Sequence, residues 1–519
     1  MKTDILAFKN FNDFWLDRVR LFGEQPCLID GEHPNVVYTY KELNELIDRT
    51  AVLLVESGLC FGDRFGLITR NRPEFFFLYL ASLKLGTLVV PIVADSPPEL
   101  IQDLIVTFNI SFLFHGTPET ERAQETKTLL SPRPLALMAL DDLKECLSRI
   151  QPRSNLYNKT RLDRPGSLYF SSGTTGTPKG IPQSPKNLLA SAWALGRAYR
   201  FTAADTQMGI MPCYHTALAT CGFLPGLTLG STFVLYECFH RSTFWSNLAA
   251  SGALFVNVVP TILSILLKEK TDTILPPLPR LKFIGSASAP LSVALQEQFE
   301  TRFRIRISNQ HGLSETGALF FNPAEPKRRR PGAIGLPIGV PIDSRLMTPD
   351  GQEAARGEVG EIAVRGPNVI SGYYHNSTET NLAWRDSWFY TGDLAYQDEV
   401  GFYFMVGRSK EMINRGGAKI SPLEVDNIIL SLIPKVSEAA TVGVPDLLYG
   451  EDIVSFVVAP EPGEILAAEI KSYCAEHLPT YKCPREIIFI DQIPQTASGK
   501  IFRRQLTTRY LEQYANQNH

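Results

Sequence analysis

The chain contains the stretch Ser171-Ser172-Gly173-Thr174-Thr175-Gly176-Thr177-Pro178-Lys179-Gly180, directly after the strand-like residues 167–170. Glycines allow successive backbone N–H groups to turn toward a phosphate, while the hydroxyl side chains and Lys179 add donors and a positive charge. The stretch therefore predicts a loop that binds a nucleotide polyphosphate. A flexible surface loop is the alternative interpretation.

This loop does not have the Walker A pattern. A Walker A motif places four residues between its glycines and ends in Lys-Ser or Lys-Thr, whereas this stretch ends in Pro178-Lys179-Gly180. The spacing therefore disfavours a P-loop kinase or ATPase.

On the N-terminal side of the loop, the sequence alternates between helical and strand patterns. Thr39 and Glu42 have the spacing of a capping box, and apolar residues then recur at helical spacing, which predicts a helix over residues 40–57. Short apolar runs predict strands at residues 64–68, 88–92 and 111–114. This alternation is typical of a mostly parallel sheet covered by helices.

The alternation returns after residue 180, so we expect two related α/β halves. The second half has candidate strands at residues 207–211, 232–235, 254–259, 282–284 and 304–309. Residues 332–404 change to short strands punctuated by Gly, Pro and Asp, which predicts a small β-rich subdomain. Beyond it, a helix start at Ser421-Pro422 and later strand patterns predict a compact α+β domain.

Length and composition exclude several classes of protein. A chain of 519 residues is long enough for two or more domains, and its net charge of −3 gives no support to a nucleic-acid partner. The eight cysteines contain no close pair suited to a metal, so we expect reduced thiols in a cytoplasmic protein. The N-terminus lacks a signal-peptide pattern, and the apolar residues 75–93 are interrupted by Lys84, Gly86 and Pro91. We therefore expect no transmembrane segment.

Four further motifs follow the loop in chain order. They are Gln310-His311-Gly312-Leu313-Ser314-Glu315-Thr316, Tyr390-Thr391-Gly392-Asp393, Gly407-Arg408-Ser409-Lys410-Glu411 and Pro494-Gln495-Thr496-Ala497-Ser498-Gly499-Lys500. With these motifs the chain resembles the adenylate-forming superfamily, which includes acyl-CoA synthetases, adenylation domains of peptide synthetases and luciferases. The resemblance covers nearly the whole chain.

The resemblance implies an α/β fold with two domains of unequal size. A large N-terminal domain, at residues 1–406, would contain the two α/β halves and the small β-rich subdomain. A hinge at residues 407–411 would lead to a small mobile α+β C-terminal domain at residues 412–519, which would carry the catalytic lysine.

The resemblance also implies a site for ATP and Mg²⁺. The loop would wrap the β- and γ-phosphates, and Thr174 with Glu315 would hold Mg²⁺, a hard cation that prefers oxygen ligands. Asp393 would accept hydrogen bonds from the ribose hydroxyls, which Arg408 would also contact. The residues expected at ATP are Ser171, Ser172, Gly173, Thr174, Thr175, Gly176, Thr177, Lys179, Ala287, Ser288, Ala289, Gln310, His311, Gly312, Ser314, Asp393 and Arg408.

Three of these assignments have a structural alternative. His311 stands where the family more often has tyrosine, so it would either stack on adenine or serve as a packed structural histidine. Glu315 could equally be a solvated loop carboxylate, and Asp393 a turn aspartate after Gly392. Ser314, where threonine is common, still offers a hydroxyl to the α-phosphate.

Lys500 is the residue that the resemblance connects to the chemical step. Adenylation builds negative charge at the α-phosphate as a carboxylate attacks and pyrophosphate leaves, and a positioned cation stabilises that charge. An ordinary surface lysine is the alternative. Lys410 matches the hinge position of the family, where the backbone turns so that the C-terminal domain presents a second face.

The thiol acceptor is expected to be coenzyme A. Gly416 and Gly417 would let its pantetheine arm pass beside a backbone strand, and His215 matches a gate between this tunnel and the acyl site. The peptide-synthetase domains of the superfamily hold the amino group of their substrate with an aspartate near the positions of residues 211–216. This chain has no acidic residue there, which disfavours an amino-acid substrate. Mostly small side chains would form a pocket for an aliphatic or aryl acid, as in fatty acid metabolism: Cys213, His215, Ala217, Thr220, Cys221 and Gly222.

The basic run Lys327-Arg328-Arg329-Arg330 has two interpretations. It would either contact the phosphates of CoA or form a solvated surface loop.

The sequence therefore predicts an AMP-forming acyl-CoA synthetase with Lys500, Glu315 and His215 as catalytic residues. Its expected small molecules are ATP, Mg²⁺, a carboxylic acid and CoA. The alternatives are a stand-alone enzyme that loads a carrier protein, a luciferase-like oxygenase and an inactive nucleotide- or acyl-binding module. The sequence leaves the acid and the oligomeric state open.

Overall fold

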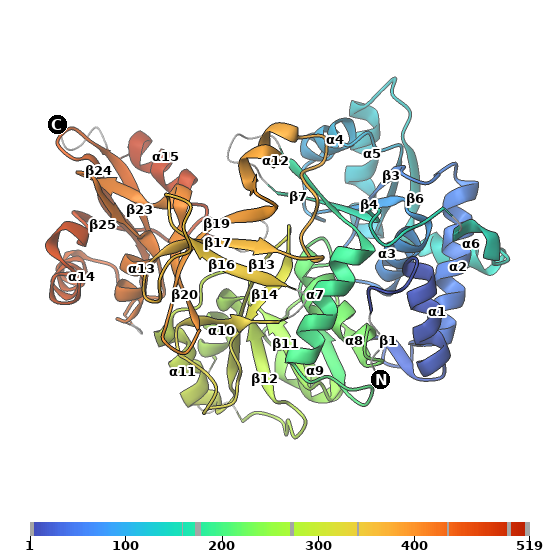
Figure 1. Ribbon diagram of the computed structural model, residues 1–519, viewed down its shortest axis with the longest axis horizontal. Helices are drawn as coiled ribbons and strands as arrows, with labels where there is room; N and C mark the ends of the chain where they lie inside the picture. Colours follow the sequence, from blue (N-terminus) through green and yellow to red (C-terminus); the bar gives the residue numbers. More distant parts are fainter. Residues whose placement is uncertain are drawn as a thin grey trace.

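The computed structural model describes residues 5–157, 159–171, 178–269, 274–339, 342–432, 435–495 and 500–513. Two β-sheets belong to a large N-terminal part of the chain, and a third belongs to a small C-terminal part, coloured orange to red in Figure 1. This α/β architecture with a large and a small domain confirms the predicted fold class. The boundaries at residues 406 and 412 stay predictions.

The first sheet has six strands in the order β6-β5-β3-β4-β7-β8, and only the β7–β8 pair is antiparallel. Its strands are β3 (Arg64–Ile68), β4 (Leu88–Ile92), β5 (Phe112–His115), β6 (Ala136–Ala139), β7 (Ser167–Ser171) and β8 (Lys179–Gln183). The helices between them are α3 (Pro73–Leu85), α4 (Pro98–Thr107), α5 (Thr120–Leu129) and α6 (Leu143–Ser148), with 3₁₀ turns at Thr117–Glu119, Leu140–Asp142 and Ser154–Tyr157.

Two helices show how the sequence determines this half. α2 (Tyr40–Glu56) begins with the predicted capping box, in which the Thr39 side chain accepts from the Glu42 N–H and the Glu42 carboxylate accepts from the Thr39 N–H. Every residue of α3 is buried, and so is every residue of β4. The apolar residues 75–93 thus form a buried helix and a buried strand. In the described part of the chain, no helix combines the length and apolar character needed to span a bilayer.

The second sheet has a mostly parallel half. Its strands are β9 (Thr206–Gly209), β10 (Thr232–Leu235), β11 (Phe255–Val258), β12 (Phe283–Ser286) and β13 (Ile307–Leu313), together with β1 (Pro26–Asp30) and β2 (Val37–Thr39). β1 pairs in parallel with β10 although more than 200 residues separate them in the chain, so the N-terminal segment completes the second half and not the first.

Helices and turns connect or flank this half. They are α1 (Phe11–Phe22), α7 (Pro185–Ala198), the π-helix η4 (Leu218–Phe223), α8 (Leu224–Leu227), α9 (Phe244–Ser251), α10 (Pro260–Leu267) and α11 (Val293–Phe303). Buried side chains of α9, α10 and α11 form one apolar cluster with residues of β9 to β13. Burial of this cluster fixes the carboxyl ends of β11, β12 and β13 side by side, where several predicted site residues lie.

The predicted β-rich subdomain is an antiparallel continuation of the same sheet. The order β13-β14-β15-β20-β19-β17-β16 joins it to the parallel strands, and β18 pairs with β19. The strands are β14 (Gly317–Phe321), β15 (Ala333–Pro337), β16 (Asp343–Met347), β17 (Gly360–Arg365), β18 (Trp384–Arg385), β19 (Trp388–Gln397) and β20 (Tyr403–Arg408), with α12 (Ser377–Ala383) before β18. β19 and β20 carry Asp393 and Arg408, so this continuation supplies part of the candidate site.

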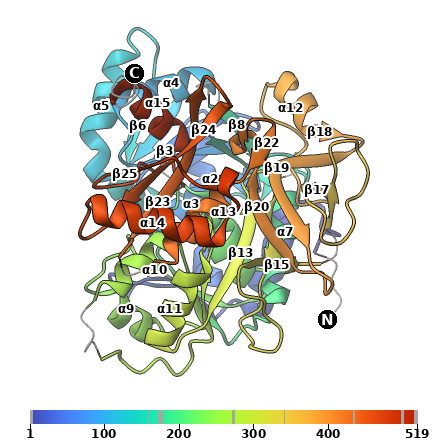
Figure 2. The same ribbon diagram turned by 90° about the vertical axis from the view of Figure 1, so that its left-hand side faces the viewer.

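The C-terminal part has a sheet of its own with the order β22-β21-β24-β23, and β25 pairs with β24. Figure 2 views the molecule from the side on which this part lies. Its elements are β21 (Ile413–Arg415), β22 (Ala418–Ile420), α13 (Pro422–Leu430), β23 (Glu438–Asp446), β24 (Gly450–Val458), α14 (Glu464–His477), β25 (Glu486–Phe489) and α15 (Arg503–Gln513), with 3₁₀ turns at Ser409–Glu411 and Thr480–Lys482.

The basic run before Pro331 is only partly exposed, and its contact with the phosphates of CoA stays a prediction. Arg329 is buried, and its guanidinium lies 2.8 Å from the carboxylate of Glu300 on α11. Arg330 lies over the ring of Phe402 and forms an ion pair with Asp398 at 3.7 Å. These two arginines therefore connect the loop to the surrounding structure, which corrects the view of the whole run as a solvated loop.

Candidate functional site

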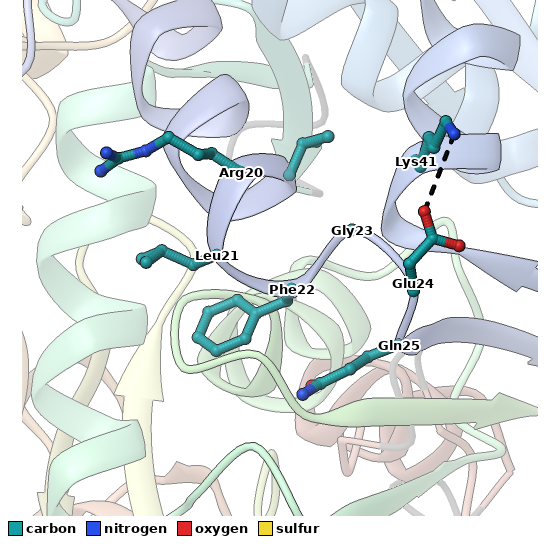
Figure 3. Close-up of a pocket in the computed structure, with 8 residues that line it drawn as sticks. Arg20, Leu21, Phe22, Gly23, Glu24, Gln25 and Lys41 are labelled. Atoms are coloured by element: carbon teal, nitrogen blue, oxygen red, sulfur yellow. Dashed lines mark ion pairs between the residues drawn. The ribbon is translucent and has the colours of Figure 1, made fainter.

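One depression of the surface lies apart from the predicted motif residues. A depression of about 420 Å³ lies at the end of α1, where it is lined by residues 19–25 and Lys41. Glu24 and Lys41 face each other across it at 3.7 Å (Figure 3). None of these lining residues belongs to a predicted motif.

The predicted phosphate loop connects two paired strands. β7 and β8 are antiparallel, and Ser171 at the end of β7 pairs with Lys179 at the start of β8. The predicted phosphate-binding residues Ser172, Gly173, Thr174, Thr175, Gly176 and Thr177, and the side chain of Ser171, lie outside the described residues. Among the residues of this loop that were predicted to bind ATP, Lys179 is the one whose side chain the structure describes.

Lys179 contacts two residues that the sequence did not single out. Its ammonium group forms an ion pair with Glu379 of α12, and it lies 5.5 Å from the ring centre of Tyr373. The Lys179 side chain is 14% exposed and that of Glu379 is 24% exposed, so the pair is partly shielded from water. The cation predicted for the phosphates therefore already has a carboxylate partner from the same chain.

Tyr373 links this pair to Glu315. The Tyr373 hydroxyl donates a hydrogen bond of 3.0 Å to Oε1 of Glu315. Burial, followed by the negative charge of Glu315, raises the pKa of Tyr373 above its ordinary value, which keeps the hydroxyl protonated as a donor. One tyrosine thus contacts both the predicted phosphate cation and the predicted metal ligand.

Asp393 lies between His311 and Arg408. Its side chain is 1% exposed, Nε2 of His311 lies 2.9 Å from Oδ2, and Nε of Arg408 lies 2.9 Å from Oδ1. Burial alone would raise the pKa of this carboxyl, but the His311 hydrogen bond and the charges of Arg408 and Lys500 hold it below its ordinary value. Three residues from β13, β19 and β20, all predicted to bind the nucleotide, are therefore in direct contact.

Lys500 belongs to the same electrostatic environment although it comes from the C-terminal part. The pKa of Lys500 is lowered mainly by the loss of surrounding water and next by the positive charge of Arg408. The negative charges of Asp393, Glu315 and Glu411 raise it by less. Lys500 is exposed, so it lies at the edge of this group of charged residues. Residues Thr496 to Gly499 of the same motif lie outside the described residues.

His215 is neutral over the usual pH range. Burial, and then the charge of Lys500, lower its pKa from 6.5 to about 4. The interaction with Lys500 also relates the predicted acyl gate to the predicted adenylation residue. His215 and Lys500 thus affect each other although they lie far apart in the sequence.

The two predicted walls of the adenine slot come from neighbouring parallel strands. Ala287, Ser288 and Ala289 follow β12, Gln310 to Gly312 lie on β13, and the register pairs Ser286 with Asn309. Ligands of α/β sheets commonly bind at the carboxyl ends of parallel strands, which is where both walls lie. His311 directs Nε2 to Asp393, so its role as a stacking partner stays a prediction.

The predicted acyl pocket residues lie on one short segment. Cys213 is buried, and its backbone N–H donates to Oδ1 of Asn71 at 2.7 Å. Ala217 precedes the π-helix η4, which carries Thr220, Cys221 and Gly222. π-Helical turns are uncommon and occur often at functional sites, because they rearrange the side chains on one face.

Hydrogen bonds connect this segment to the nucleotide motif. The hydroxyls of Thr216 and Ser314 lie 3.3 Å apart. Asn257, on β11, donates 2.9 Å to the carbonyl of Cys221 and accepts 3.0 Å from Nε2 of Gln310. The predicted acyl and adenine sites are therefore neighbours, and Asn257 is a polar contributor that the sequence motifs did not indicate.

The predicted hinge and CoA residues lie on exposed backbone. Lys410 is in the 3₁₀ turn Ser409–Glu411 and is exposed. Gly416 and Gly417 form the turn between β21 and β22 with φ of 58° and 87°, where glycine avoids the strain of a Cβ atom. The Gly416 N–H donates 2.8 Å to the carbonyl of Tyr449.

Comparison with known proteins assigns the chain to a family. The family model described as AMP-binding enzyme matches residues 16–374, and the model described as AMP-binding enzyme C-terminal domain matches residues 424–500. The chain belongs to the AMP-binding enzyme family. This result confirms the resemblance to adenylate-forming enzymes, and the second match falls in the smaller part of the chain.

Relatives within the AMP-binding enzyme family match over most of their length. The chain is 32% identical to a protein named probable CoA ligase CCL9 from Humulus lupulus over 94% of this chain and 93% of that one. It is 31% identical to oxalate–CoA ligase from Arabidopsis thaliana over 91% and 94%. The solved structure of ATP-bound MatB from Rhodopseudomonas palustris has a TM-score of 0.86 and 25% identity, over 97% and 100%.

The oxygen chemistry of the described residues fits Mg²⁺. Glu315 contributes a carboxylate whose Oε1 accepts from Tyr373, and a second oxygen remains for a cation. Mg²⁺ commonly takes one or two protein carboxylates together with substrate phosphates and water. The described ranges contain no group of three His, Cys, Asp or Glu side chains able to hold a metal.

Tyr373, Glu379 and Asn257 were missed by sequence reasoning. Each lies outside the five motifs, and each contributes through one or two side-chain contacts across the fold. The positions Gly372-Tyr373-Tyr374 follow the β-rich pattern without any spacing that indicates a nucleotide site. The hydrogen bond from the Tyr374 N–H to the Gly180 carbonyl and the ion pair between Glu379 and Lys179 join this segment to β8.

Proposed function

We propose that the protein is an AMP-forming acyl-CoA synthetase. It uses ATP to convert a carboxylic acid into an acyl-adenylate and pyrophosphate, and then transfers the acyl group to the thiol of CoA. The observation that carries this proposal is the gathering of distant motifs around Asp393: His311 and Arg408 contact it directly, and Lys500 acts on it electrostatically.

The first step forms an acyl-phosphate anhydride bond. A carboxylate oxygen of the acid attacks the α-phosphorus, and the bond between this phosphorus and the β-phosphate bridging oxygen breaks, so pyrophosphate leaves. Lys500 stabilises the negative charge that develops at the α-phosphate, as a positioned cation does. Lys179 binds the β- and γ-phosphates.

Asp393 and Arg408 orient the ribose, and Glu315 with Thr174 would hold Mg²⁺. The bound cation would neutralise charge on the leaving pyrophosphate. The lowered pKa of Asp393 keeps its carboxylate ionised. An ionised carboxylate can accept hydrogen bonds from both ribose hydroxyls, which supports the proposed role of Asp393. Tyr373 holds Glu315 in one orientation through its hydroxyl.

The second step breaks the bond between the acyl carbon and the AMP oxygen. The sulfur of CoA attacks the acyl carbon, the thiol loses its proton, and AMP leaves. Gly416 and Gly417 accommodate the pantetheine arm, and His215 acts as a gate between that arm and the acyl pocket. The neutral imidazole of His215 fits this position, since it adds no charge beside Lys500.

The acid is a small-molecule carboxylate, and the pocket of Cys213, Ala217, Thr220, Cys221 and Gly222 suits an aliphatic or aryl chain. Two relatives are named for oxalate and sulfoacetate, so small polar acids belong in the same test. A cytoplasmic location remains part of the proposal.

The deciding experiment measures pyrophosphate release by the purified protein with ATP and Mg²⁺. The acids tested are fatty, aryl, dicarboxylic, sulfonated and amino acids, each with and without CoA. Release stimulated by one acid, together with its acyl-CoA product, supports the proposal. Adenylation without a CoA product would point to a carrier protein as acceptor. No pyrophosphate release with any of the acids would support an inactive binding module.

A further inference from the structure

The ion pair between Lys179 and Glu379 joins two elements that are 200 residues apart in the chain. Lys179 begins β8, directly after the predicted phosphate loop, and Glu379 lies in the first turn of α12. Both side chains are partly shielded from water. In this arrangement the carboxylate of Glu379 is paired with the ammonium group of Lys179, which is the group that would bind the triphosphate.

The position of Glu379 is fixed by contacts around it. Its backbone N–H donates 3.0 Å to Oδ1 of Asn376, which caps α12. The Tyr373 N–H donates 2.9 Å to the hydroxyl of Thr380, and the Tyr374 N–H donates 2.8 Å to the carbonyl of Gly180 beside the lysine. The helix is thus attached to β8, and Glu379 meets Lys179 because the backbone holds it there.

Tyr373 completes this arrangement. Its ring faces the ammonium group of Lys179 at 5.5 Å, and its hydroxyl donates to Glu315. Tyr373 therefore contacts Glu315 through its hydroxyl and Lys179 through its ring, while Lys179 is paired with a second carboxylate, that of Glu379.

We propose that Glu379 is an internal competitor for Lys179, so that its charge sets the affinity for nucleotides with β- and γ-phosphates and leaves the affinity for AMP unchanged. The inference rests on the proposed function, because it takes Lys179 to bind those phosphates. Without ATP, the Glu379 carboxylate neutralises Lys179. When ATP binds, the lysine turns to the phosphates, and the carboxylate either loses its partner or repels the incoming charge. Both effects weaken triphosphate binding.

The test compares nucleotide binding by the full-length protein and its Glu379→Gln variant. Glutamine keeps the size and a hydrogen-bonding oxygen but removes the charge. Isothermal titration with MgATP and with AMP should give an ATP dissociation constant about three- to tenfold lower in the variant, as expected for the loss of one partly shielded charge. The AMP dissociation constant should be unchanged, because AMP lacks the phosphates that reach Lys179.

Two further variants isolate the effect. Glu297→Gln removes an exposed carboxylate on α11 and should alter neither constant. In a Lys179→Met background, Glu379→Gln should lower the ATP dissociation constant by a smaller factor, because the pair that ATP has to break is already absent. Thermal unfolding of each variant checks that the fold is retained.

The outcomes separate the inference from the function on which it rests. Weaker ATP binding by Glu379→Gln would overturn the inference, since Glu379 would then position Lys179 for the phosphates. An equal change for ATP and AMP would also overturn it, because the effect would come from altered packing of α12. Failure of the wild-type protein to bind either nucleotide would instead reject the proposed function.

Discussion

At the scale of single residues, Asp393 shows what a motif predicts and what it leaves open. The sequence predicted Asp393, His311 and Arg408 as nucleotide ligands, one from each of three motifs. It did not predict that they contact one another, because that contact depends on the antiparallel register of β19 and β20, which pairs Asp393 with Arg408. It also depends on the route from β13 to β19 through β14, β15 and β20.

Lys500→Ala tests the assignment of the chemical step. We expect pyrophosphate exchange to fall by about 100- to 1,000-fold, because a preorganised cation is lost from the developing charge. The dissociation constant for ATP should change little, since Lys179 and Asp393 remain. Normal pyrophosphate exchange in the variant would contradict the role of Lys500.

His215 gives a prediction about pH. Its pKa of about 4 means that it takes up a proton only as the pH falls through that value, so it stays neutral from about pH 6 upward. We expect His215→Gln to lower the rate of CoA-ester formation without changing the shape of the pH–rate profile between about pH 6 and about pH 9. The loss of an inflection near neutral pH in the variant would show that His215 titrates there.

At the scale of elements, the sequence predicted those strands and helices whose signals are local. The predicted residues 64–68, 88–92 and 232–235 coincide with β3, β4 and β10. Each is a short apolar run bounded by turn residues, so its ends are visible in the sequence. The capping box gave the start of α2 for the same reason.

Elements whose position depends on distant partners were not predicted. β1 and β2 belong to the second sheet because β1 pairs with β10, and nothing in residues 26–39 indicates that partner. The antiparallel strands after β13 were expected to form a small β-rich subdomain, but the sequence did not indicate that β14 and β15 join them to the parallel strands. Local patterns predict that a strand exists and leave its neighbour open.

Gly285 in β12 gives a prediction at this scale. Asn257 on β11 and Gln310 on β13 meet across it, and a Cβ atom at residue 285 would lie 2.0 Å from Oδ1 of Asn257 and 2.3 Å from Nε2 of Gln310. We expect Gly285→Ala to break that hydrogen bond, to lower the free energy of unfolding by about 1–3 kcal/mol, and to raise KM for ATP.

Chemical denaturation and steady-state kinetics measure these two effects. Gly463→Ala is the control, because a Cβ atom there meets nothing within 4 Å. If Gly285→Ala unfolds at the same denaturant concentration as the wild type and keeps its KM for ATP, the contact between Asn257 and Gln310 does not support the adenine site.

At the scale of the whole molecule, the position of the C-terminal domain is the feature that the sequence determines least. The motif ending in Lys500 could be placed near the nucleotide only by the family resemblance, since its partners Arg408 and Asp393 lie about 100 residues earlier. In this structure the lysine acts on the nucleotide residues, while Gly416 and Gly417 are exposed. We propose that this arrangement suits the first half-reaction and that the second uses the other face of the domain.

A substitution of Lys410, the predicted hinge residue, tests whether the C-terminal domain has to rotate between the two half-reactions. Lys410 lies in a helical turn, and proline fixes φ near −65°, a value that such a turn uses. We expect Lys410→Pro to retain the present arrangement and to deny the backbone a second one. Pyrophosphate exchange should then stay close to that of the wild type, whereas formation of the CoA ester should fall about tenfold or more, because domain rotation limits that step.

Lys410→Ala is the matched control, since it removes the same side chain and leaves φ free to change. Alanine should support both half-reactions, which would show that the backbone and not the ammonium group of Lys410 matters. Equal loss of both half-reactions in the proline variant would mean that proline disturbs the turn itself. Full CoA-ester formation by Lys410→Pro would instead mean that rotation occurs elsewhere in residues 407–411, or that CoA reaches the acyl-adenylate in the arrangement seen here.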